Sequence, residues 1–183
     1  MPRIELTTEI RAPIEEVFNL SRSIDVHKQS QISRKETAIA GKTSGLIEEG
    51  ESVTWEAVHF GIKQKLTSRV TEMKKPTYFR DSMVSGAFKR FDHDHFFRKK
   101  KEGITEMVDV FDYTSPLGFL GVIADKLFLE KYMKDLLLER NTEIKRIAEE
   151  GIKQTSIVNA RSHQKTSEKH CTLKVTGSHD YSQ

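Results

Sequence analysis

The sequence of 183 residues contains a single cysteine, Cys171. One cysteine cannot form a disulfide within the chain, and it cannot supply a metal site built from several thiolates. A chain without disulfides fits a reducing compartment. We therefore expect the protein in the cytoplasm.

Long uncharged apolar runs are also missing. Residues 1–18 lack the apolar segment of a secretory signal peptide. The most apolar stretch, residues 117–138, carries six charged side chains: Asp125, Lys126, Glu130, Lys131, Lys134 and Asp135. Such a segment would not cross a bilayer cheaply. No membrane span is predicted.

The sequence lacks the short motifs of several enzyme classes. It contains no Gly-rich phosphate loop, no Gly-x-Ser-x-Gly nucleophile elbow and no His-Glu-x-x-His metal helix. A catalytic function, if present, must use side chains that the fold brings together from separate segments.

The positive charge is concentrated in the last 32 residues, 152–183. This segment holds five basic and two acidic residues, a balance of +3 that equals the net charge of the whole chain. Residues 1–151 are therefore near neutral, which argues against nucleic-acid binding. Because residues 152–183 are polar and show no sustained apolar period, we predict a domain over 1–151 and a disordered tail over 152–183. Residues from about Gln154 onward should be dispensable for folding.

The remaining pattern predicts an α+β domain. Residues 3–10 alternate as a strand, and two short helical segments follow, the first with Pro13 at its first helical position. Residues 51–113 contain strand patterns separated by short turns, which indicates an antiparallel meander. Ser115 and Pro116 then predict the start of a long helix that ends near Gly151. We expect a curled sheet of six to seven strands wrapped on this helix, with a cavity between them.

Alternation along the strands predicts which side chains face that cavity. Folding residues 90–101 and 104–114 about the turn at 102–103 places His95 opposite Asp109 and His93 opposite Phe111. The predicted ligand-binding residues are Trp55, His59, Phe79, Asp81, Phe91, His93, His95, Phe97, Met107, Asp109, Phe111 and Tyr113.

The segment RFDHDHFF, residues 90–97, has three interpretations. Its histidines can orient the polar end of a ligand in an apolar pocket. They can instead form a structural pair with a carboxylate, or they can converge on a metal ion, since alternate strand residues lie about 6.5–7 Å apart. We expect a hydrogen bond between His95 and Asp109, with no metal and no cofactor, because only one carboxylate is predicted within easy reach of the histidines.

Four segments carry a resemblance to a known superfamily: APIEEVFNL, GLIEEGESVTWEAVHFGIKQKLTSRVTEM, GAFKRFDHDHFF and YTSPLGFLGVIADKLFLEKYMKDLLLERNTEIK. Residues 1–150 resemble the SRPBCC (START-like, polyketide cyclase/dehydrase-like) superfamily, in particular a bacterial branch with HFG, H-x-H and PLG-x-LG patterns. The resemblance implies a helix-grip fold with a deep hydrophobic pocket. The superfamily includes lipid and hormone carriers as well as cyclases and shares no catalytic residue.

Three functions remain open at this stage. The first is binding of a small, largely hydrophobic molecule between the sheet and the long helix. The second is a cyclase or dehydratase type of enzyme that uses a His–Asp pair as acid and base. The third is a regulatory domain that acts on a partner protein, since domains of the similar branch occur fused to sugar-nucleotide-epimerase-like proteins. A homodimer also stays open.

Overall fold

A computed structural model describes residues 2–59, 61–115 and 128–175, with side chains as far as Gln154. The chain divides into two compact units, Met1–Ala148 and Glu149–Gln183. Among the described residues, no helix has both the length and the apolar composition that a membrane span requires.

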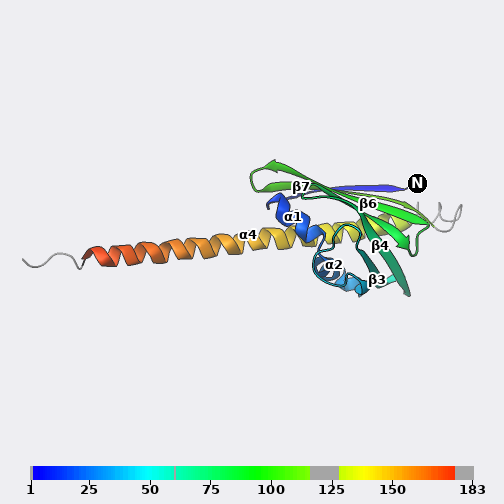
Figure 1. The fold of residues 1–183 in the computed structure, drawn as a ribbon, viewed down its shortest axis with the longest axis horizontal. Helices are drawn as coiled ribbons and strands as arrows, with labels where there is room; N and C mark the ends of the chain where they lie inside the picture. Colours follow the sequence, from blue (N-terminus) through cyan, green and yellow to red (C-terminus); the bar gives the residue numbers. More distant parts are fainter. Residues whose placement is uncertain (1, 60, 116–127, 176–183) are drawn as a thin grey trace, which may run out of the picture. The chain divides into compact units, whose positions relative to one another are not determined.

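Seven strands of the first unit form one curled antiparallel sheet (Figure 1). The strand order is β1-β7-β6-β5-β4-β3-β2, so β3 to β7 form the predicted meander, β2 extends it by one strand, and β1 pairs with β7. The strands are β1 (Arg3–Ile10), β2 (Thr37–Gly41), β3 (Ser52–His59), β4 (Ile62–Lys74), β5 (Tyr78–Ser85), β6 (Arg90–Lys101) and β7 (Ile104–Thr114).

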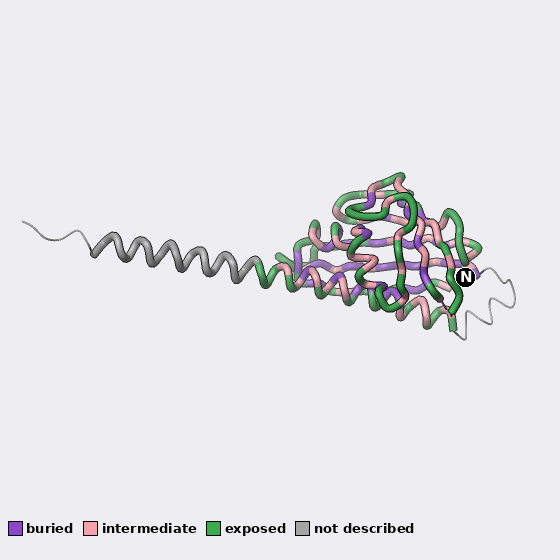
Figure 2. Tube along the Cα trace, turned by 90° about the horizontal axis from the view of Figure 1, so that it is seen from below, coloured by how far each residue is buried: buried purple, intermediate pink, exposed green. Residues whose placement is uncertain are grey.

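Burial alternates along the strands, as the sequence pattern predicts (Figure 2). In β6, His93 and His95 are buried together with the flanking Phe91 and Phe97, while Phe96 is exposed. The same period continues on β7. One face of the sheet therefore carries the core, and the histidines lie on that face.

Two short helices follow β1, as predicted: α1 (Ile14–Ser21) and α2 (Ile24–Ser30). Two acidic residues in the first turn of α1 favour its positive end. Ser23 caps α2, because its hydroxyl accepts a hydrogen bond from the Val26 amide at 3.3 Å. A short 3-10 helix, η1 (Ile32–Arg34), leads into β2.

The long helix α4 runs over Glu130–Val175. Its predicted start at Ser115 and Pro116 falls at residues 116–127, which lie outside the described residues. The predicted end at Gly151 is wrong, because the helix continues to Val175. A glycine within a helix costs only about 1 kcal/mol, and no proline follows it before Val175. The division into domain and tail, and the dispensability of the tail, stay predictions.

The core face of the sheet is covered by α1 and by the part of α4 that belongs to the first unit. Phe18 of α1 meets Phe79 and Phe97 edge-on, with ring centroids 5.7 and 5.3 Å away. Leu137 of α4 packs in a separate buried group with aromatic residues of β6 and β7. The α+β helix-grip architecture expected from the sequence is confirmed.

Candidate ligand-binding cavity

A cavity of about 470 Å³ lies between the sheet and α4 in the first unit. This volume falls within the usual range of small-molecule sites, about 300–1,000 Å³. Its wall comes mainly from β3 to β6, α2 and the beginning of α4. The wall is largely apolar, with aromatic residues such as Trp55, Phe79 and Phe91.

Eight of the twelve predicted ligand-binding residues line this cavity. They are Trp55, His59, Phe79, Asp81, Phe91, His93, His95 and Phe111. Their contact with a ligand stays a prediction.

The other four predicted residues, Phe97, Met107, Asp109 and Tyr113, lie outside the cavity lining. Phe97 and Met107 are buried in the core beside α1, where the Ser21 hydroxyl contacts the Met107 sulfur at 3.3 Å. Tyr113 belongs to a second buried group, and Asp109 is fully buried. Strand alternation identifies the inward face correctly, but α1 fills part of the space in front of that face.

The predicted strand register at the histidines is confirmed. His95 pairs with Asp109 and His93 with Phe111 across β6 and β7. The His95 Nδ1 atom lies 2.6 Å from Asp109 Oδ1, which is a short hydrogen bond. The predicted pair therefore exists, and its carboxylate is completely shielded from solvent.

Helix α4 supplies further partners of Asp109. The Asn141 side-chain amide donates to Asp109 Oδ2 at 2.7 Å, and Arg140 Nη1 lies 3.4 Å from Asp109 Oδ1. Arg140 is itself fixed, because Nη2 donates to the Ser21 carbonyl at 2.7 Å. Neither residue is among those predicted from the sequence. A signal was present, since Asn141 takes a position of the apolar stripe that also contains Leu137 and Ile144.

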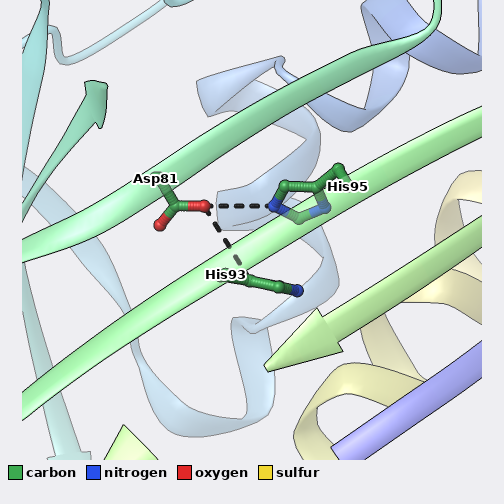
Figure 3. Close-up of side chains that lie close together, drawn as sticks. All are labelled: Asp81, His93 and His95. Atoms are coloured by element: carbon green, nitrogen blue, oxygen red, sulfur yellow. Dashed lines mark hydrogen bonds and ion pairs between the residues drawn. The ribbon is translucent and has the colours of Figure 1, made fainter. Parts of the chain in front are cut away.

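A second carboxylate approaches the histidines from β5 (Figure 3). Asp81 Oδ1 lies 3.1 Å from His95 Nε2 and 3.9 Å from His93 Nδ1. The expectation of a single carboxylate within reach is therefore wrong. Both ring nitrogens of His95 face carboxylates, whereas a neutral imidazole can donate only one hydrogen bond. The contact with Asp81 thus requires a second proton on the ring, a proton on Asp81, or a cation.

Burial and charge act in opposite directions on the pKa values of the His–Asp cluster, which consists of Asp81, His93, His95 and Asp109. Burial alone would raise the pKa of Asp109, but contacts with His93 and His95 and the Arg140 charge outweigh it and hold that pKa well below its usual range. The pKa of Asp81 is also lowered, because His95 and the neighbouring positive charges outweigh burial. Both carboxylates are therefore charged at neutral pH.

His93 is the least satisfied member of the cluster. Burial, followed by repulsion from His95, lowers the pKa of His93, so its neutral form is favoured. His93 Nε2 lies 3.3 Å from Asp109 Oδ1 but makes no hydrogen bond there, because the orientation is poor. A buried ring with an unsatisfied nitrogen is costly in an apolar space.

A second polar group lines the cavity along β3 and α2. His59 Nδ1 lies 2.8 Å from the Tyr132 hydroxyl, which connects β3 to α4. His27 is tilted against Trp55 with ring centroids 4.2 Å apart, and its Nε2 lies 3.3 Å from Glu36 Oε1. Burial lowers the pKa of His59, with partial opposition from Glu36. Of these polar residues, only His59 is among the residues predicted from the sequence.

No protein-family model matches the sequence, and a comparison with curated proteins yields no relative. Solved structures do match. A START superfamily protein from Mycobacterium smegmatis has a TM-score of 0.61 at 14% identity, covering 81% of this chain and 97% of that one. The Zhui aromatase/cyclase from Streptomyces sp. R1128 has a TM-score of 0.67 at 12% identity, covering 82% and 95%.

A plant protein shares the same architecture. The ginseng major latex-like protein 151 from Panax ginseng has a TM-score of 0.60 at 15% identity, covering 80% of this chain and 97% of that chain. At these identities the likeness establishes the fold alone. The chain has an SRPBCC-type, START-like helix-grip fold, as the sequence resemblance implied.

Proposed function

We propose that the protein binds a small, largely hydrophobic molecule in the cavity between the sheet and α4. The observation that carries this proposal is the cavity of about 470 Å³, with an apolar wall and a compact His–Asp cluster on one part of it. Apolar contacts supply affinity, and a few placed polar groups fix the orientation of a ligand. The START-like fold supports the same function.

The cluster suits the polar end of such a ligand. Asp81 and His93 border the cavity, while Asp109 lies behind them and holds the His95 ring in place. A ligand hydroxyl can donate to Asp81, and a ligand carbonyl can accept from a ring N–H. We therefore expect an apolar molecule with one oxygen-bearing end in preference to a pure hydrocarbon.

Ligand uptake can be measured directly on the purified full chain. Native mass spectrometry after gentle purification should reveal a bound molecule of small mass. Titration with a fluorescent fatty-acid analogue should give saturable binding of one probe per chain, and an unlabelled analogue should displace it. Absence of saturable binding to protein with a native circular-dichroism spectrum would count against the proposal.

A second candidate is an enzyme of cyclase or dehydratase type. The observation that favours it is the orientation of His95, whose Nδ1 is held at 2.6 Å by the buried Asp109 while the ring borders the cavity. An imidazole fixed in this way can transfer a proton to or from a bound ketone or hydroxyl substrate. Activity can be screened on ketone and hydroxyl substrates, and the turnover rate of any substrate found should fall at least 100-fold in His95→Ala. Unchanged turnover in both His95→Ala and Asp109→Asn would remove the proposed base.

A further inference from the structure

We propose that Asp81, His93 and His95 hold a divalent transition-metal ion on the wall of the cavity, with Asp109 as the outer carboxylate that orients both histidines. Each of the three residues offers one ligand atom, and these atoms lie within 4.8 Å of one another. The proposal does not depend on hydrophobic ligand binding. It reverses the expectation from sequence, which counted only one carboxylate near the histidines.

The strands place the three side chains on one face. His93 and His95 alternate along β6, and Asp81 is the direct β5 partner of His93 (Figure 3). Zinc bonds of about 2.0–2.2 Å put two tetrahedral donor atoms about 3.4 Å apart. The distances from Asp81 Oδ1 to His95 Nε2 and His93 Nδ1, 3.1 and 3.9 Å, lie on either side of that value. The histidine donor atoms lie within 4.8 Å of each other, so side-chain rotation must bring them closer for one ion to contact all three residues.

Asp109 is positioned as the outer partner of both rings. His95 directs Nδ1 to Asp109 Oδ1 at 2.6 Å, and His93 Nε2 lies 3.3 Å from the same oxygen. In each ring the other nitrogen is the one nearer to Asp81. Metal-binding histidines commonly donate their second N–H to a carboxylate, which fixes the tautomer and leaves a lone pair for the ion. Here the buried Asp109 carboxylate can accept the second N–H of both histidine rings.

The charges and the unsatisfied groups also favour a cation. Two carboxylates, Asp81 and Asp109, face the two histidine rings, and Arg140 contacts only Asp109 of these two. Without a cation, the contacts of His95 with both carboxylates need an additional proton on the ring or on a carboxylate, and His93 Nε2 has no hydrogen-bond partner. An ion between the three donors replaces that proton. It also fixes the His93 tautomer whose Nε2–H faces Asp109.

The donor set and its location indicate the type of site. Two imidazoles and one carboxylate suit zinc or iron(II), whereas calcium and magnesium prefer oxygen ligands. All three residues border the cavity, so the remaining coordination positions would face it. Three protein ligands with an open position are typical of catalytic metal sites. Such an ion would bind water or an oxygen atom of a cavity ligand.

The test uses the full chain, freed of metal with a chelator and then titrated with Zn²⁺ by calorimetry and with Co²⁺ by absorption spectroscopy. We expect one equivalent of either ion, and for Co²⁺ the visible absorption of four- or five-coordinate geometry. Affinity should fall at least 100-fold in His93→Ala. It should fall 10- to 100-fold in Asp109→Asn, which changes only the outer partner. His59→Ala is the matched control, because His59 borders the cavity outside the cluster, and it should bind as the wild type does.

Asp81→Asn is a second variant, needed in case His93→Ala fails to fold. It should fold normally, because Asp81 is partly exposed and asparagine has the same shape. Its circular-dichroism spectrum should stay native while Zn²⁺ affinity falls at least 10-fold. Folded wild-type protein that takes up no stoichiometric Zn²⁺ or Co²⁺ would overturn the proposal, as would unchanged binding in both Asp81→Asn and His93→Ala. Titration of the metal-free protein with the fluorescent fatty-acid analogue is a separate measurement, so failure of one proposal leaves the other intact.

Discussion

Replacing Asp109 by alanine should lower the free energy of unfolding at pH 7 by about 3–5 kcal/mol, because it breaks a buried charged network. The substitution leaves Arg140 without its buried counter-charge, and it leaves His95 Nδ1 and one N–H of the Asn141 amide without an acceptor. Unpaired donors in a solvent-free space each cost about 1–3 kcal/mol. Urea unfolding monitored by circular dichroism measures the change, with the midpoint falling at constant slope.

The pH of that measurement matters for the sign of the effect. The pKa of Asp109 is lowered well below its usual range, because the histidine contacts and Arg140 outweigh burial. A group with a lowered folded pKa stabilises the fold above its unfolded pKa, about 3.9 for aspartate. This stabilisation is lost as pH falls through the folded value. At pH 7 it is fully present, so the difference between wild type and variant is largest there.

Asp112 provides a matched control on the same strand. It lies on the outer face of β7, and its half-exposed carboxylate contacts Arg90 at 2.9 Å. Exposed ion pairs contribute about 0–1 kcal/mol, so Asp112→Ala should change stability by no more than that. The loss of stability in Asp109→Asn should lie between those of Asp109→Ala and Asp112→Ala, since asparagine keeps an acceptor but loses the charge. A cost below 1 kcal/mol for Asp109→Ala, measured without metal, would contradict the structural role of the network.

The sequence predicts the β6–β7 half of the cluster well. Period-two alternation puts His93 and His95 on one face, and the short turn at residues 102–103 fixes how β6 meets β7. Local rules of this kind are strong because each depends on neighbouring residues only. The His95–Asp109 contact follows from them.

The rest of the site depends on tertiary packing. Asp81 approaches His95 only because the β5–β6 register sets Phe79 opposite His95 and Asp81 opposite His93, across a connection whose length is not a standard tight turn. Arg140 and Asn141 reach Asp109 through the rotation of α4 about its axis. That rotation is set by apolar packing of α4 residues such as Leu137 and Ile144 in the first unit rather than by local spacing.

The division of the inward face between core and cavity is also a tertiary property. Met107 has the same alternation as the cavity residues, yet α1 covers it completely. Sequence periodicity says that a side chain points inward but does not say what fills the space in front of it. This is why eight predicted residues line the cavity and four do not.

Ala57→Trp should weaken binding of the fluorescent fatty-acid analogue by roughly 30-fold. Ala57 lies on β3 between Trp55 and His59, is buried, and borders the cavity, so a larger side chain there takes space that the ligand would use. Displacing about six ligand atoms at about 0.3 kcal/mol each removes about 2 kcal/mol of binding free energy. Stability should change little, because the indole can extend into the cavity instead of into packed core.

Val58→Trp is the control for this substitution, since Val58 is the next residue of β3 and its side chain is 39% exposed on the opposite face. It adds the same indole to the same strand without entering the cavity, so probe affinity should stay within twofold of wild type. Zn²⁺ binding should be retained in both variants, because Ala57 offers no ligand atom and lies outside the group formed by Asp81, His93 and His95. Equal probe affinity in Ala57→Trp and wild type, with both proteins folded, would mean that the probe binds elsewhere. In that case the cavity would not be the site of hydrophobic ligand binding.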